Sequence, residues 1–270
     1  MRKRRLLSGL LALLLTALPA GAESALTVTF LDIGKADTIL LRTENSAVLI
    51  DAGMEEDGDA VLQMLAAQGV EALDALIITH YDKDHVGGAD AVLSAIPVRR
   101  VLDPAYEKGG KQVREFIEAA LGAGVEPESL TENIAFELDG LRYEIDVANK
   151  ADYGEEEEND FSLVTRVTCG TKVFLFAGDA ENPRLKELLK EGSLAADVLK
   201  VPHHGKYEKK SLPFFEAVGA HWGVITSSDE EPEDEETLEA LRAAGTEPLL
   251  TREGTIIMTC DGQEIQVTQE

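Results

Sequence analysis

Two histidines and two aspartates lie within six positions of the sequence: His80, Asp82, Asp84 and His85. Imidazole nitrogens and carboxylate oxygens are ligands that zinc, manganese and iron accept. The cluster follows the apolar run 75–78 and precedes a helical pattern over 89–96, with Gly87 and Gly88 expected to allow a sharp turn. Helix capping by one aspartate is the simpler interpretation, but it gives no reason for the flanking histidines. The pattern therefore indicates a metal-binding loop between a buried strand and a helix.

Further ligand types follow other apolar runs. Asp179 comes directly after the strand pattern 172–176, and His203 with His204 comes after the pattern 197–201. Strands that end in polar residues at the same edge of a sheet bring those residues together. The sequence thus predicts one site built from three separate segments.

Several short motifs carry a resemblance to a known family. The metal-binding loop resembles the His-x-His-x-Asp-His signature of the metallo-β-lactamase superfamily, with Asp82 where the second His usually stands. The Asp variant is similar to the extracytoplasmic hydrolase domain of ComEC, the competence DNA-uptake channel protein. Other pieces match that domain in order: Phe30-Leu31-Asp32-Ile33-Gly34, Asn159-Asp160-Phe161-Ser162, Ala177-Gly178-Asp179 and the segment 197–205. The resemblance covers nearly everything from about Leu26 onward.

The resemblance implies two divalent metal ions, zinc or manganese, and a set of roles for the predicted residues. Asp179 would bridge the two ions. His80 and Asp82 would hold one of them, and the other would be held by Asp84, His85 and one of His203 or His204. Asp51 would support the metal-binding loop without binding metal. Asn159 stands where the superfamily often has a further His, so it is expected near the ions, as a supporting or coordinating group.

By analogy with the superfamily, the resemblance and the aspartate-rich ligand set imply a hydrolase that acts on phosphoesters. Two cations a few ångströms apart acidify a shared water and clamp the oxygens at phosphorus. Asp84, His203 and His204 are therefore the predicted catalytic residues. The histidine of the pair that binds no metal would protonate the leaving alcohol, and the sequence does not decide which one that is. Lys200 and Lys206 are candidate phosphate contacts, although Lys206 also fits an exposed, solubilising lysine.

The elements that must position these residues occur in two similar series. Strand patterns with short breaks and frequent hairpin signals alternate with amphipathic helices, and no Gly-x-Gly-x-x-Gly loop is present. The series fits one α/β domain of two facing sheets with helices outside, a metallo-β-lactamase-type αββα four-layer sandwich. We expect this domain to span residues 23–270.

Residues 1–22 read as a secretory signal peptide. Arg2 to Arg5 form a charged start, Leu6 to Leu18 an apolar core of 13 residues, and Ala20-Gly21-Ala22 a small-residue cleavage site. An uncleaved anchor is the competing interpretation, but this core is shorter than the roughly 20 residues that span a bilayer. The mature chain is thus expected to be secreted or extracytoplasmic, with no membrane span after cleavage.

The net charge of −26 restricts the partners of the chain. Without residues 1–22, 21 basic residues face 51 acidic ones, and the net charge becomes −30. Such a surface repels phosphate backbones and gains little from counterion release, so no tight non-specific nucleic-acid binding is expected. Cys169 and Cys260 are compatible with a disulfide in an extracytoplasmic compartment, but the sequence does not say whether they meet.

Three functions remain open at this stage. The first is an exported, metal-dependent phosphodiesterase or nuclease, with single-stranded DNA as one candidate substrate. The second is a hydrolase of a small or cell-envelope phosphoester, of the phosphocholine-esterase type. The third is a non-catalytic metal-binding module.

Overall fold

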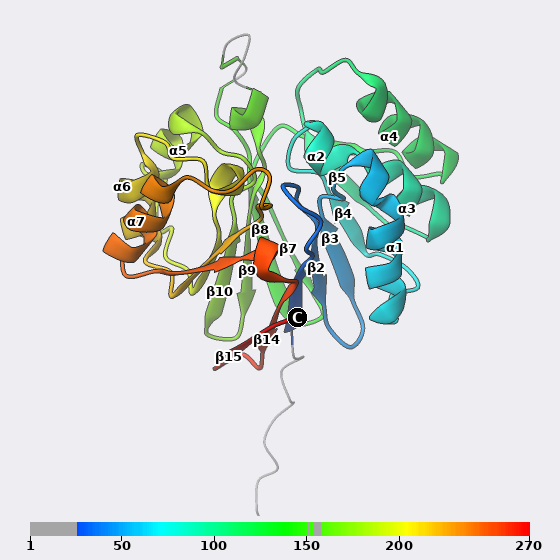
Figure 1. The fold of residues 1–270 in the computed structure, drawn as a ribbon. Helices are drawn as coiled ribbons and strands as arrows, with labels where there is room; N and C mark the ends of the chain where they lie inside the picture. Colours follow the sequence, from blue (N-terminus) through cyan, green and yellow to red (C-terminus); the bar gives the residue numbers. More distant parts are fainter. Residues whose placement is uncertain (1–25, 151, 154–157) are drawn as a thin grey trace, which may run out of the picture.

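Two β-sheets pack face to face in the computed structural model, which describes residues 26–150, 152–153 and 158–270 (Figure 1). Within these residues the first sheet has the order β15-β14-β1-β2-β3-β4-β5-β6. Its strands are β1 (Leu26–Phe30), β2 (Ile39–Arg42), β3 (Ala47–Ile50), β4 (Ala75–Ile77), β5 (Val101–Pro104), β6 (Glu128–Leu130), β14 (Ile256–Cys260) and β15 (Ile265–Gln269). The second sheet has the order β13-β12-β11-β10-β9-β8-β7. Its strands are β7 (Ile134–Leu138), β8 (Leu141–Asp146), β9 (Val164–Cys169), β10 (Lys172–Phe176), β11 (Val198–Lys200), β12 (Trp222–Ile225) and β13 (Glu247–Leu250).

Each sheet has an antiparallel part and a parallel part. Strands β1 to β3 are antiparallel, whereas β3 to β6 are parallel; in the second sheet β7 to β10 are antiparallel and β10 to β13 parallel. The turn between β7 and β8 is a two-residue hairpin turn, with both Asp139 and Gly140 in the left-handed region. Parallel neighbours need crossover connections, and these supply the helices.

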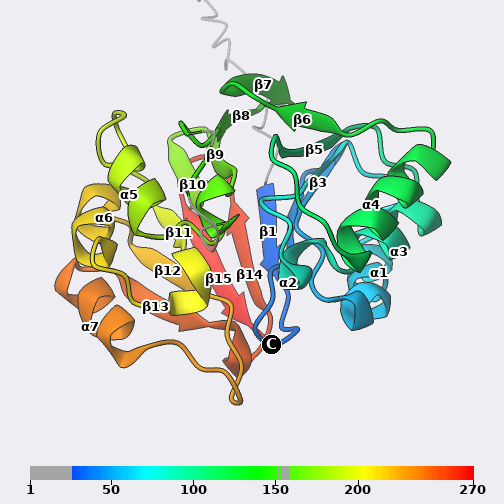
Figure 2. The same cartoon turned by 90° about the horizontal axis from the view of Figure 1, so that it is seen from above.

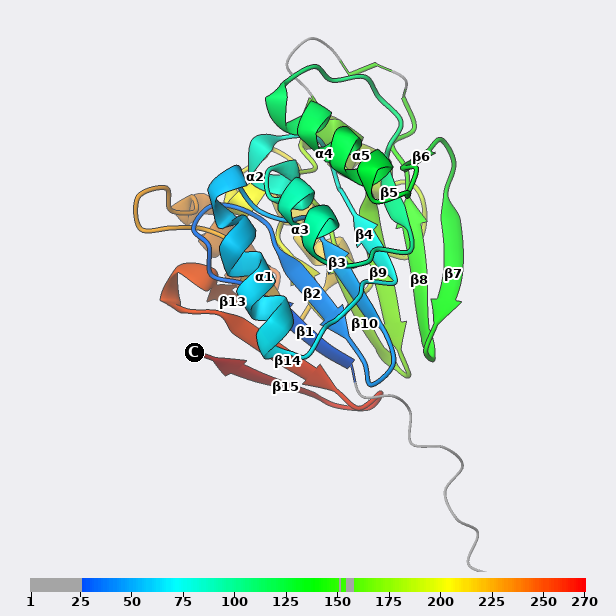
Figure 3. The same ribbon diagram turned by 90° about the vertical axis from the view of Figure 1, so that its right-hand side faces the viewer.

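The helices cover the outer faces of the two sheets (Figure 2). On the first sheet lie α1 (Gly58–Ala67), α3 (Ala89–Ala95) and α4 (Lys111–Gly122), and on the second α5 (Asn182–Leu188), α6 (Ser211–Val218) and α7 (Glu235–Ala243). Short helical turns are α2 (Lys83–Val86), η1 (Glu55–Asp57), η2 (Glu158–Phe161), η3 (Pro202–Gly205) and η4 (Thr251–Glu253). Figure 3 shows α1, α3 and α4 in front of the first sheet. The predicted αββα sandwich is therefore confirmed.

Three apolar clusters separate the layers. The central one lies between the sheets and includes Phe30 and Phe176, whose ring centroids are 6.1 Å apart. The other two lie between each sheet and its helices. Cys169 and Cys260 meet in the central cluster, where Cys169 Sγ lies 3.9 Å from the carbonyl oxygen of Cys260. The predicted elements are present, and the short edge strand β6 was not predicted because two of its three residues are exposed and polar.

Residues 1–22, the predicted signal peptide, lie outside the described residues. Among the residues that the structure describes, no helix is both long and apolar enough to cross a membrane.

Candidate metal centre

The metal-binding loop is held against the first sheet by its backbone. His80 follows β4, and Asp84 and His85 lie on the single helical turn α2. The carbonyls of Asp84 and His85 accept hydrogen bonds from the N–H groups of Asp37 and Ala52, at 3.0 and 2.8 Å. The loop therefore rests on the β1–β2 loop and on the residues after β3.

Gly87 and Gly88 serve a different purpose from the predicted one. Their φ angles, −58° and −88°, are available to other residues, so neither is needed for a sharp turn. A Cβ on Gly88 would lie 2.3 Å from the carbonyl oxygen of Ala52, and one on Gly87 would lie 2.5 Å from the N atom of Glu55. These glycines allow the backbone of the loop to pack directly on the segment after β3.

The later ligands come from two neighbouring strands of the second sheet. Asp179 follows β10 after Gly178, which has a φ of 53°. His203 and His204 follow β11, with φ angles of 48° and 52°. Non-glycine residues in the left-handed region are uncommon and are concentrated at functional sites. This local conformation directs the two adjacent imidazoles toward different partners.

Four of the predicted ligands form one compact group: Asp84, His85, Asp179 and His204. One ligand atom from each lies within 4.8 Å of all the others. Nε2 of His204 is 3.2 Å from Asp179 Oδ2 and 3.3 Å from Asp84 Oδ2, while Nε2 of His85 is 3.3 Å from Asp179 Oδ1. We call these residues the four-ligand group. Two sheets and three loops contribute to it, whereas the sequence pattern predicted the three segments at one edge of a sheet.

His80 and Asp82 lie beside this group. Nε2 of His80 is 3.8 Å from Asp82 Oδ2, and the rings of His80 and His85 are 4.1 Å apart. Asp82 also forms an ion pair with Lys108. Within the described residues, His80 and Asp82 do not join Asp179 in a compact group of the same kind. The second metal position that the sequence predicts stays a prediction.

The imidazoles of the four-ligand group are oriented from behind. Asp51 accepts hydrogen bonds from the N–H and the hydroxyl of Thr79, and its Oδ2 lies 2.8 Å from Nδ1 of His85. Nδ1 of His204 lies 2.9 Å from the carbonyl oxygen of Thr226. Each contact fixes Nδ1 and directs Nε2 toward the other ligands, as is common behind metal-bound histidines. The predicted supporting position of Asp51 agrees with these contacts.

The charges in the group stabilise one another strongly. Burial alone would raise the pKa of Asp84, but hydrogen bonding to His204 and the charge of His85 lower that pKa to about 2. Burial alone would lower the pKa of His204, but Asp179 and Asp84 raise that pKa to about 9. The pKa of His85 is likewise held well above its usual value, against the effect of burial, by Asp179 and Asp51. Anions and cations thus lie side by side in a largely buried group, in which the Asp84 side chain is 17% exposed.

The residues present fit a divalent metal ion. His80 Nε2 and Asp179 Oδ1 are buried and make no hydrogen bond among the described residues, although Asp179 Oδ1 lies 3.3 Å from His85 Nε2 and 3.5 Å from Lys200 Nζ. Buried polar atoms without a partner are costly, and a cation coordinated by them removes that cost. The donors, imidazole nitrogen and carboxylate oxygen, suit zinc and manganese.

His203 lies on the outer side of the four-ligand group. Its Nδ1 is 2.9 Å from Glu181 Oε1, and its Nε2 is 4.0 Å from Asp179 Oδ2. The Asn159 amide nitrogen lies 3.3 Å from Glu181 and 3.5 Å from His203 Nε2. Asn159 therefore contacts His203 and Glu181 rather than the four-ligand group. The sequence left open which of these two histidines would be a metal ligand. In the structure His204 lies in the four-ligand group, and His203 lies beside it.

Two residues of the site have positions that the sequence did not indicate. Asp37 is 1% exposed, and its carboxylate lies behind the rings of His85 and His204. Lys200 is fully buried and lies 2.5 Å from Asp37, so the prediction that it contacts a substrate phosphate is wrong. A lysine inside an apolar strand pattern requires a buried acidic partner, and this signal was available in the sequence.

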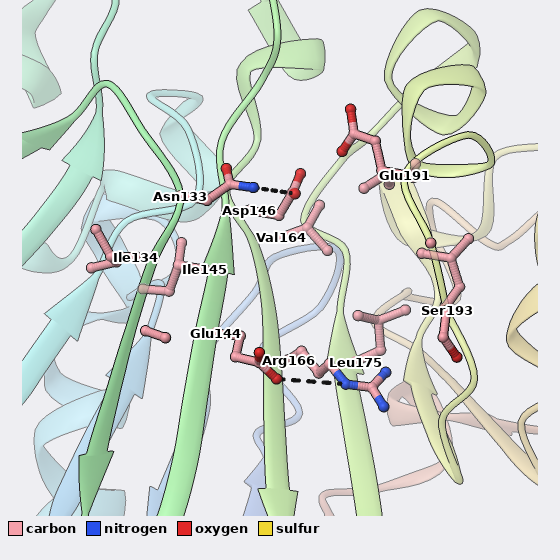
Figure 4. A pocket seen from close by; sticks show the side chains of 14 residues that line it. Asn133, Ile134, Glu144, Ile145, Asp146, Val164, Arg166, Leu175, Glu191 and Ser193 are labelled. Carbon is pink, nitrogen blue, oxygen red and sulfur yellow. Dashed lines mark hydrogen bonds and ion pairs between the residues drawn. The ribbon is translucent and has the colours of Figure 1, made fainter.

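A separate cavity of about 460 Å³ lies on the outer face of β7 to β10 (Figure 4). It is lined by residues such as Ile145, Val164, Leu175 and Arg166, with Arg166 paired to Glu144. None of the predicted site residues lines this cavity. This cavity is therefore separate from the four-ligand group.

Comparison with known proteins agrees with this geometry. A family model described as the metallo-beta-lactamase superfamily matches residues 31–217, and the chain belongs to that superfamily, whose members are largely metal-dependent hydrolases.

Individual relatives show which members of the superfamily this chain is similar to. The chain is 27% identical over 219 residues to the ComE operon protein 3 of Bacillus subtilis, covering 74% of this chain and 28% of that protein. It is 28% identical over 210 residues to the competence protein ComA of Neisseria gonorrhoeae, covering 76% and 27%. The chain thus spans about a quarter of the length of these relatives. The crystal structure of the metallo-beta-lactamase fold protein YhfI from Bacillus subtilis aligns with a TM-score of 0.60 at 14% identity, covering 88% of this chain and all of that one.

Proposed function

We propose that the mature chain is an extracytoplasmic, metal-dependent phosphodiesterase that cleaves single-stranded DNA as a nuclease. The observation that carries this proposal is the four-ligand group, with His203 held beside it by Glu181. A bound divalent ion, or a pair of them, would acidify a water and neutralise charge on a phosphate. The likeness to proteins named for the ComE operon and for competence supports a nucleic-acid substrate.

The residues of the site divide into holding and proton-transferring groups. Asp84, His85, Asp179 and His204 hold the cation, and Asp51 orients His85. His203 donates a proton from Nε2 to the leaving oxygen, while the Glu181 carboxylate lies 2.9 Å from Nδ1 as its ion-pair partner. His203 suits this role because its side chain is 13% exposed, whereas that of His204 is buried.

Cleavage assays with two substrates test this function. The purified mature chain is incubated with Mn²⁺ or Zn²⁺ and either single-stranded DNA or bis-p-nitrophenyl phosphate, beside an Asp84→Ala variant. We expect cleavage of DNA by the wild-type chain and a loss of at least about 100-fold in the variant, because it lacks a metal ligand. The control is Asp261→Ala, which changes an exposed carboxylate at the β14–β15 turn and leaves cleavage unchanged.

Other outcomes would identify the alternative functions. Hydrolysis of the small ester without cleavage of DNA would contradict the nuclease and indicate a hydrolase of small or cell-envelope phosphoesters. Bound metal with no hydrolysis of either substrate would indicate a non-catalytic metal-binding module.

A further inference from the structure

Lys200 lies beneath the four-ligand group, at the end of β11. Its side chain is fully buried. Its Nζ lies 2.5 Å from Asp37 Oδ2, 3.2 Å from the carbonyl oxygen of Gly178 and 3.5 Å from Asp179 Oδ1. The ammonium group therefore bridges a carboxylate that lies behind the ligands and a carboxylate that is one of them.

Asp37 extends this contact toward both histidines of the group. One of its oxygens accepts a hydrogen bond of 2.6 Å from the hydroxyl of Thr226. Its carboxylate lies 3.6 Å from Nδ1 of His204 and 3.8 Å from Nδ1 of His85. Lys200 and Asp37 thus form a buried ion pair directly behind the ligand atoms.

The excess of buried carboxylates around the histidines explains why Lys200 is paired with Asp37. Three fully or almost fully buried aspartates surround the histidines of the group: Asp37, Asp51 and Asp179. A buried carboxylate without a cation is strongly unfavourable. Even when both histidines of the group are protonated, two positive charges do not balance these three carboxylates, and both imidazoles must be neutral once they bind a metal. Lys200 is the one ammonium group in contact with two of these aspartates in the described part of the chain.

We propose that Lys200 is an internal counter-ion, which balances Asp37 and Asp179 when no metal is bound and competes with metal for Asp179. This proposal rests on the metal centre proposed above. The fixed charge lets the ligand set fold before a cation arrives. It also lowers the affinity for metal, because a positive charge stays beside a ligand of the cation.

The test compares Lys200→Met with the wild-type chain and with Lys172→Met. Methionine keeps most of the length of the side chain and removes its charge. Lys172→Met is the matched control, because Lys172 pairs with Asp197 at 3.0 Å in another ion pair of the second sheet. Thermal unfolding is measured with chelator and with saturating Mn²⁺, and Mn²⁺ affinity is measured by calorimetry.

We expect Lys200→Met to lower the unfolding temperature of the metal-free chain more than that of the metal-loaded chain. The dissociation constant for Mn²⁺ should fall about tenfold or more, since the competing charge is gone. Lys172→Met should shift both unfolding temperatures equally and leave the affinity unchanged.

The failures of the two proposals can be distinguished. A wild-type chain that neither Mn²⁺ nor Zn²⁺ stabilises would overturn the metal centre and the counter-ion together. A wild-type chain stabilised by metal, beside a Lys200→Met variant with equal metal stabilisation and unchanged affinity, would overturn the counter-ion alone. If Lys200→Met does not fold without metal, Asp37→Asn is added; restored folding supports the proposal, and continued misfolding overturns it.

Discussion

His203 and His204 are neighbours in the chain, yet they contact different partners. His204 contacts Asp84 and Asp179 within the four-ligand group, whereas His203 contacts Glu181. Consecutive left-handed backbone conformations separate the two rings, whose centroids lie 6.3 Å apart. The proposed division into ligand and proton donor rests on this separation.

Substitutions of His203 and His204 should therefore affect metal binding and hydrolysis differently. His204→Gln should lose metal and the hydrolysis of both substrates. His203→Gln should keep its metal and lose about 10²–10⁴-fold in the cleavage of DNA, whose leaving alkoxide requires a proton. It should lose much less with bis-p-nitrophenyl phosphate, whose leaving group is stable without one. Equal losses on the two substrates in His203→Gln would contradict its role as the acid.

The charges of the group also predict how the metal-free chain responds to pH. The folded-state pKa of His204 is about 9, above its ordinary value of 6.5. A raised pKa contributes stability that is complete below pH 6.5 and is lost as the pH rises through 9. Thermal unfolding in chelator should thus occur at progressively lower temperature across this interval, and added metal should weaken the trend. An unfolding temperature that rises over this interval would show that His204 is not held by the carboxylates.

At the scale of the element, the metal-binding loop depends on direct backbone packing. Gly88 N–H donates to the carbonyl of Gly53 at 3.2 Å, and no space exists for a Cβ at Gly88. Gly88→Ala should destabilise the fold by about 1–3 kcal/mol and weaken metal binding, because the loop must move outward.

The matched control for this change is Gly122→Ala at the end of α4, where a Cβ meets nothing within 4 Å. Alanine there should be neutral or stabilise the helix by up to about 1 kcal/mol. Chemical denaturation measures both effects. A Gly88→Ala variant as stable as Gly122→Ala would refute the account of the loop.

The strands and the ligand types could be predicted from the sequence because both depend on local patterns. Apolar runs indicated β4, β10 and β11, and polar residues at their ends indicated a shared edge. The partners that His203 and Lys200 contact could not be predicted in the same way. The left-handed backbone angles of His203 determine where its ring points. Lys200 contacts Asp37, which lies 163 positions away in the chain.

At the scale of the molecule, the excess of acidic residues limits how DNA is bound. A net charge of −26 disfavours an extended basic surface for a phosphate backbone. Binding of single-stranded DNA should therefore be weak, and cleavage should not decrease as salt rises from about 50 to 200 mM, unlike that of proteins that release many counterions. Cleavage rates across a salt series measure this. A steep loss of activity with salt would reveal a basic binding surface that the composition does not suggest.

The central claim is that distant strand ends assemble a metal centre, and metal analysis tests it most directly. Protein purified without chelator, and protein loaded with Mn²⁺ or Zn²⁺ and then desalted, is compared with Asp179→Ala treated identically. We predict one to two divalent ions per wild-type chain, as in one- and two-metal hydrolases, and a clear loss in the variant. A wild-type chain that retains no divalent ion after loading, or a variant that retains as much as the wild type, would contradict the account.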